Sequence, residues 1–206
     1  MTATPPGLRA AILALPLALA AAACAPVGPV PTATLPPDAV TGAGDPTRAA
    51  IIGTASAFSS PDRLAGRPAE AARAVANYEY LAVELPTGPR WRGFTGTLEG
   101  QLLEGRAELR QALGIAPDAP PQAVIDSLYA ASRALSAGDQ AAAERLLSPP
   151  TYQGGGAATL QRLAALPPMP RVNVAAAGAA GELHRMDTQG QFRSQGADSP
   201  GGAGYR

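Results

Sequence analysis

Apolar residues recur every three or four positions between about residues 45 and 166. This spacing gathers them on one side of a helix and predicts a series of amphipathic helices. Proline and glycine separate the apolar runs, and no run alternates apolar and polar residues convincingly enough to make a sheet. The pattern predicts an all-α fold, a single small bundle of five or six helices over residues 45–166.

The predicted helices start near residues 46, 68, 95, 121, 140 and 157. Asp45 precedes Pro46 as an N-cap before a proline at the first helical position, and Asp139 can cap the fifth helix. In the first helix, Ile51, Ile52, Ala55 and Phe58 form the predicted apolar stripe. Pro86 is expected to end the second helix.

The third helix carries three glycines, at positions 96, 100 and 105. Each weakens a helix by up to about 1 kcal/mol relative to alanine. They are either tolerated or let another helix approach closely.

Both flanks of the predicted bundle lack the helical pattern. Residues 24–44 are rich in proline and glycine and are expected to form a semi-extended linker. Residues 167–206 contain little large apolar surface, so we expect a disordered tail, with 171–174 as one short strand-like exception.

The first 23 residues follow the order of a secretory signal. Arg9 supplies positive charge, an uncharged apolar stretch follows, and Ala21-Ala22-Ala23 precede Cys24, the only cysteine of the chain. The apolar stretch is too short to span a bilayer as a helix, and Pro16 disfavours a continuous membrane helix.

Ala21-Ala22-Ala23-Cys24 resembles the lipobox of a bacterial lipoprotein precursor, although alanine occupies position 21, where leucine is favoured. The resemblance covers only the first 24 residues, and no family is indicated for the mature domain. It implies a diacylglyceryl group on the Cys24 thiol and cleavage before Cys24. Ala25, in place of aspartate, implies the periplasmic side of the outer membrane rather than the inner membrane.

Two other interpretations of this segment stay open. Ala21-Ala22-Ala23 is also a plain secretory cleavage site, which would leave Cys24 as a free or intermolecularly paired thiol. An uncleaved anchor is the third.

The charge of the chain limits its possible partners, and its composition limits what can form its core. All 16 basic residues are arginines, and they balance 16 acidic residues. Without the leader the chain has no basic surplus for holding phosphates, so we expect no nucleic-acid partner. Aromatic residues make up only 4% of the chain, so the core must rely on leucine, isoleucine and closely packed alanine.

The richest candidate contact site is Arg90-Trp91-Arg92, followed by Phe94. Arginine and tryptophan are enriched in binding hot spots, and arginine over an aromatic ring suits an anion or the face of a sugar. In a chain this poor in aromatic residues, however, we favour Trp91 and Phe94 as core anchors with both arginines solvated.

Nothing else in the sequence forms a recognisable catalytic or metal site. Two carboxylate pairs could suggest hydrolysis of a sugar, Glu79 with Glu84 and Glu104 with Glu108. The second pair is expected on a solvated face of its helix. His184 is the only histidine and cannot alone supply a metal site or a triad. We expect no cofactor, no metal and no catalytic residue.

These patterns predict a membrane-anchored envelope lipoprotein with a non-catalytic helical domain for interaction or support. Its partners would be the membrane, through Cys24, and an envelope protein. One alternative is an accessory lipoprotein that binds an envelope glycan or another anionic ligand through Arg90, Trp91 and Arg92. A second is an enzyme with an unrecognised site.

Overall fold

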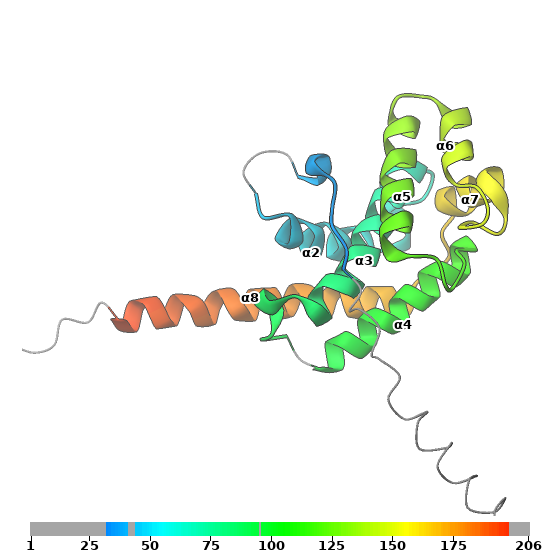
Figure 1. The fold of residues 1–206 in the computed structure, drawn as a ribbon. Helices are drawn as coiled ribbons and strands as arrows, with labels where there is room; N and C mark the ends of the chain where they lie inside the picture. Colours follow the sequence, from blue (N-terminus) through cyan, green and yellow to red (C-terminus); the bar gives the residue numbers. More distant parts are fainter. Residues whose placement is uncertain (1–31, 41–43, 95, 198–206) are drawn as a thin grey trace, which may run out of the picture. The chain divides into compact units, whose positions relative to one another are not determined.

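The computed structural model describes residues 32–40, 44–94 and 96–197, which belong to one compact unit, Pro31–Arg206. Over these ranges the chain forms seven α-helices and no strand, which confirms the all-α bundle (Figure 1). The helices are α2 (Pro46–Ala57), α3 (Pro68–Thr87), α4 (Gly96–Leu113), α5 (Pro121–Ser136), α6 (Gln140–Leu146), α7 (Gly155–Ala164) and α8 (Pro170–Ala197). Three short 3-10 segments accompany them, η2 (Pro37–Ala39), η3 (Pro61–Arg63) and η4 (Pro89–Trp91).

Helices α2 to α7 are the six helices that the sequence predicts, and most of their ends follow the expected signals. The Asp45 side chain caps α2 by accepting hydrogen bonds from the backbone N–H of Thr47 at 3.0 Å and of Arg48 at 3.3 Å. The predicted stripe of α2 is wrong at one position, because Ile52 is 59% exposed while Thr54 is buried. Pro86 lies inside α3, which continues to Thr87.

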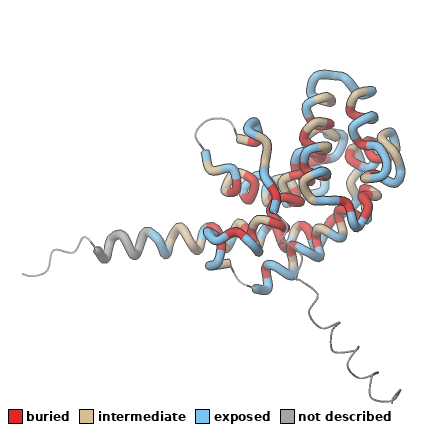
Figure 2. Tube along the Cα trace, in the orientation of Figure 1, coloured by how far each residue is buried: buried red, intermediate tan, exposed pale blue. Residues whose placement is uncertain are grey.

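Helix α3 is the centre of the unit. It packs against α2 and α5, which lie on either side of it in Figure 1, and it also contacts α4 and α7. Buried residues follow its whole length in the tube of Figure 2, many of them alanines. Small side chains let the neighbouring helices approach closely, so a chain with few aromatic residues still builds one continuous core.

The predicted disordered tail is wrong for residues 170–197, which form α8, and the strand-like 171–174 lie inside this helix. One side of α8 packs against α4 and α2. Burial is strong over the first half of the helix and fades along it (Figure 2). The buried residues recur at helical spacing and are Val172, Ala175, Ala176, Ala179 and Leu183.

Helix α4 supplies much of what makes α8 stable. The Glu108 carboxylate accepts hydrogen bonds from the backbone N–H of Arg171 at 3.1 Å and of Val172 at 3.0 Å, so it caps the start of α8. Gly105 of α4 lies where α4 meets α8 and Tyr78 of α3. An added Cβ there would overlap the Tyr78 hydroxyl and come within 3.2 Å of the Val172 Cα.

The predicted linker 24–44 is wrong where the structure describes it. Residues 32–40, here called the strap, lie against the helices, with Ala33 and Ala39 buried. The strap is held by side chains: Gln122 accepts from Thr34 N–H at 2.8 Å and donates to Thr34 C=O at 3.1 Å. Proline disfavours an α-helix or a strand in the strap, whose regular structure is the 3-10 segment η2, but it does not prevent this docking.

Two arginines hold the other end of the strap. Arg133 of α5 pairs with Asp38, with Nη1 at 3.1 and 2.9 Å from its two oxygens, and Arg73 of α3 donates to Ala39 C=O at 2.7 Å. The strap therefore belongs to the folded unit. Residues 24–31 and 41–43 lie outside the described residues.

Two glycines of α4 provide a matched test of this packing. Gly105→Ala should lower the free energy of unfolding by about 1–3 kcal/mol, because its methyl group overfills the crossing with Tyr78 and α8. Gly100→Ala should raise it by up to about 1 kcal/mol, because Gly100 is exposed and nothing lies within 4 Å of an added Cβ. Urea denaturation of both variants measures the difference. Equal effects at the two positions would contradict the close approach at Gly105.

Candidate functional site

The structure places Trp91 in the core, with 3% of its surface exposed. Its ring meets Phe94 edge to face, with the ring centroids 5.5 Å apart. The core-anchor interpretation of Trp91 is therefore confirmed, and the residue offers no aromatic face to a glycan. The alternative site at Arg90, Trp91 and Arg92 loses the residue on which it most depended.

The two arginines beside Trp91 are both exposed. Arg90 forms an ion pair with Asp45, and its guanidinium lies 5.0 Å from the centroid of the Trp91 ring. Arg90 thus joins η4 to the start of α2. Arg92 borders a recess of about 170 Å³ shared with Glu99 of α4.

The most elaborate polar arrangement in the described unit surrounds Glu79, near the middle of α3. The Glu79 side chain is buried and pairs with two arginines of α4. Arg106 Nε lies 2.7 Å from Glu79 Oε1, while Arg110 Nη2 and Nε lie 2.5 and 3.2 Å from Oε1 and Oε2. Hydrogen bonds between a carboxylate and a guanidinium are charge-assisted and are about twice as strong as those between neutral groups.

Arg110 also binds the connection between α4 and α5. Nη1 donates to the backbone carbonyls of Ala116 at 3.1 Å and Pro117 at 2.9 Å, and Nη2 donates to that of Ala119 at 2.9 Å. With the two bonds to Glu79, all five N–H donors of this buried guanidinium have acceptors. Arg110 therefore stabilises the fold and has no N–H donor left for a substrate.

Neither predicted carboxylate pair converges on a shared space. The Glu79 carboxylate pairs with Arg106 and Arg110. Glu84 instead hydrogen-bonds with Trp91; burial raises the pKa of the Glu84 carboxyl, and this hydrogen bond opposes the shift. Glu104 is exposed, while Glu108 caps α8.

His184 lies on the exposed side of α8 instead of in a disordered tail. Within the described ranges, no three His, Cys, Asp or Glu side chains are grouped as metal ligands would be. Cys24 lies outside these ranges.

Among the hollows on the described part of the chain, one of large volume lies between the strap, α2, the turn that contains η3, and the start of α3. We call it the arginine cleft. Its volume is about 740 Å³, within the range of small-ligand pockets. Its charged lining residues are Asp62, Arg63, Arg67, Glu70 and Arg73; its apolar ones include Leu35, Ala39, Ala50, Ala57, Leu64 and Ala74. Sequence reasoning missed this cleft, because its walls come from four separate segments.

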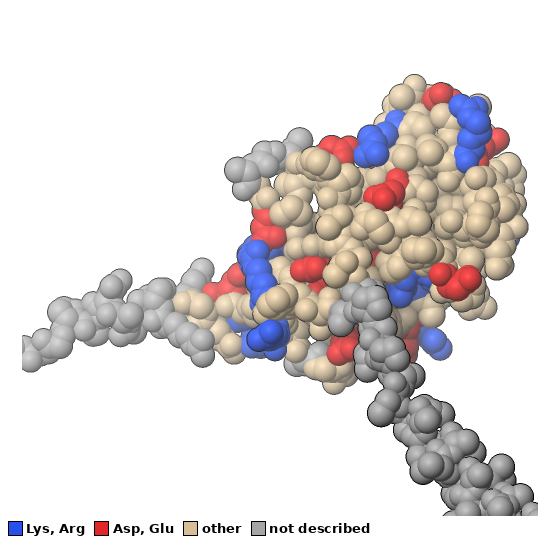
Figure 3. Space-filling model, viewed as in Figure 1, with Lys and Arg blue, Asp and Glu red and all other residues tan. Residues whose placement is uncertain are grey.

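Another hollow, of about 330 Å³, is mostly apolar and lies between the end of α2 and the proline-rich start of α8. On the face drawn in Figure 3, arginine and acidic side chains are scattered among uncharged ones, and no large area carries one sign. The arginine cleft is therefore the hollow that combines size, charge and an apolar wall.

No protein-family model matches this chain, and neither does any curated protein or solved structure.

The Glu79 network can be tested with a matched pair of glutamates. Glu79→Ala should lower the free energy of unfolding by about 3–5 kcal/mol, because it leaves the Arg110 charge buried without its partner. Glu104→Ala removes an exposed carboxylate and should change it by no more than about 0.5 kcal/mol. Denaturant titration followed by circular dichroism measures both. A loss below about 1 kcal/mol for Glu79→Ala would show that the network is not needed for the fold.

Proposed function

We propose that this chain is a bacterial envelope lipoprotein, anchored through Cys24, whose helical unit serves in interaction or support and not in catalysis. The observation that carries the proposal is the position of the only cysteine, directly behind a positive, apolar and small-residue leader. Two or more acyl chains at this position would give stable residence in a membrane. Ala25 favours the periplasmic side of the outer membrane.

Two findings on the described unit are compatible with this proposal. None of the helices within residues 32–40, 44–94 and 96–197 has both the length and the apolar character to cross a membrane. In addition, the carboxylates weighed for catalysis serve the fold or lie in solvent. A non-catalytic role remains the simplest interpretation of such a unit.

The strap sharpens the expected geometry of anchoring. Residue 32, where the strap begins, is only eight positions after Cys24. Fully extended, the chain between them spans at most about 28 Å. The helical unit would therefore lie close to the bilayer, rather than at the end of a linker of some twenty residues.

Metabolic labelling with a clickable fatty acid tests the anchor. The wild-type protein should carry the label and sediment with membranes, and Cys24→Ser should lose the label and leave the membrane fraction. Ala25→Ser is the matched control and should keep the label. Mass spectrometry of the mature protein should find Cys24 as its first residue. A secreted, unlabelled wild-type protein would instead establish plain secretory cleavage.

The short reach can be measured separately. Because Cys24 is the only cysteine and would be blocked by lipid, Thr34→Cys introduces a single reactive thiol on the strap. Energy transfer from a dye at this position to acceptors in the lipid headgroups should place it within about 35 Å of the bilayer. Inserting ten Gly/Ser residues after Ala25 should increase the mean separation. A dye beyond this limit in the protein without the insertion would contradict anchoring at Cys24.

A further inference from the structure

The arginine cleft has the chemical features of a binding site for an anion with an apolar part. Three arginines, Arg63, Arg67 and Arg73, line it against two carboxylates, Asp62 and Glu70, which leaves one positive charge in excess. All three guanidiniums come from the short stretch between η3 and the second turn of α3. All three therefore line the edge of the cleft that this stretch forms.

The interactions that these arginines make within the unit leave many donors available. Arg63 Nη1 donates to Ser56 Oγ at 3.3 Å, Arg67 Nη1 pairs with Glu70 at 3.3 Å, and Arg73 Nη2 donates to Ala39 C=O at 2.7 Å. Each guanidinium has five N–H donors, so a single such bond uses only a fraction of them. The contrast is Arg110, whose five donors are all used inside the fold.

The start of α3 adds to the positive potential of this edge. Arg67 occupies the N-cap position and does not cap the backbone N–H groups of the first turn with its side chain, and Pro68 follows at the first helical position. The N-terminal end of a helix of this length carries a partial positive charge, which favours an anion in the same place as the guanidiniums do.

Most of the other residues that line the cleft are apolar. The strap contributes Leu35 and Ala39, and α2 contributes Ala50 and Ala57. Leu64, from the turn that also carries Arg63, is buried and completes this apolar wall. A purely hydrophilic anion would leave this surface in contact with water, whereas an apolar group next to the anion would cover it.

We infer that the arginine cleft binds an amphiphile whose phosphate headgroup carries a net negative charge. Its phosphate lies between Arg63, Arg67 and Arg73, and its apolar part lies against Leu35, Ala57 and Leu64. Guanidinium forks match the paired oxygens of a phosphate in a bidentate geometry, and about 740 Å³ holds a headgroup with the first part of an acyl chain.

A membrane lipid is the natural source of such a ligand, and only this part of the inference rests on the proposed lipoprotein. The strap that forms the apolar wall begins eight residues after Cys24, so an anchored protein would hold the cleft near the phosphate layer of the bilayer. The ligand chemistry itself depends on the cleft alone.

Isothermal titration of the full chain carrying Cys24→Ser tests the ligand chemistry without a competing attached lipid. The probes are short-chain dihexanoyl phosphatidic acid below its micelle concentration, dihexanoyl phosphatidylcholine and inorganic phosphate. Phosphatidic acid should bind saturably at one site, at least tenfold more tightly than either of the others. Equal affinity for phosphatidylcholine would overturn the role of the arginines, and equal affinity for inorganic phosphate would overturn the role of the apolar wall.

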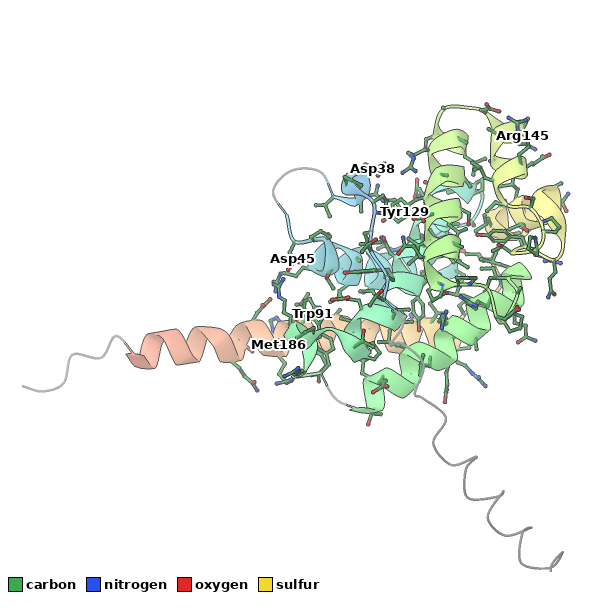
Figure 4. All side chains as sticks on the ribbon, in the orientation of Figure 1. Asp38, Asp45, Trp91, Tyr129, Arg145 and Met186 are labelled. Carbon is green, nitrogen blue, oxygen red and sulfur yellow. The ribbon has the colours of Figure 1, made fainter. Side chains whose placement is uncertain are left out.

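Variants locate the binding. Arg63→Ala and Arg67→Ala should each weaken phosphatidic acid binding at least tenfold, and Arg67→Lys should lie between Arg67→Ala and the unsubstituted residue, because it keeps the charge but loses the fork. Arg145→Ala is the control, since Arg145 is exposed on α6, away from the strap (Figure 4). An equal loss in Arg145→Ala, or no saturable binding at all, would overturn the proposal.

Two further measurements separate the possible causes of a failure. Circular dichroism verifies that the Arg63 and Arg67 variants are folded; Arg73→Ala is not used as evidence, since Arg73 also holds the strap. The fatty-acid labelling of Cys24 is independent of this titration. A labelled protein whose cleft does not bind phosphatidic acid would contradict the cleft alone, and binding without labelling would contradict the anchor alone.

Discussion

The ion pair between Glu79 and Arg110 is the constraint on which the arrangement of helices depends. Glu79 lies in the central helix, and Arg110 carries the pair to α4 and to the connection that leads into α5. Helix α4 then caps α8 through Glu108, and α5 holds the strap through Gln122 and Arg133. Through α4 and α5, one buried charge in α3 thus helps to position α8 and the strap, neither of which contacts this charge.

Much of the fold could be predicted from the sequence, because proline, glycine and capping aspartate define helix ends locally. Asp45 and Asp139 cap α2 and α6 as expected. Helix α8 could not be found in this way. Its buried side is mostly alanine, and its first N–H groups are capped by Glu108, more than sixty residues earlier. A stripe of small residues becomes significant only when a neighbouring helix is known to carry a glycine such as Gly105.

The candidate sites were harder to predict than the helices, for two different reasons. Glu79 lies one turn from Val75 on the apolar side of α3, and a charged residue on such a stripe is a signal that could have revealed the network. The arginine cleft offered no comparable signal. The strap that walls it reads as a linker by composition, and Figure 4 shows this segment, at Asp38, lying beside Tyr129 of α5, more than ninety residues along the chain. Tertiary docking of this kind leaves no periodicity in a sequence.

The packing of α8 against α2 has a consequence for the order of events during synthesis. Ile51 and Leu183 belong to the same core, yet about 130 residues separate them. At roughly 5–20 residues per second, the ribosome produces the second of these positions about 7 to 26 seconds after the first. Throughout this interval the buried sides of α2 and α4 have no α8 to cover them. The chain therefore remains incompletely folded until late in translation, and α2 depends on a helix that the ribosome produces last.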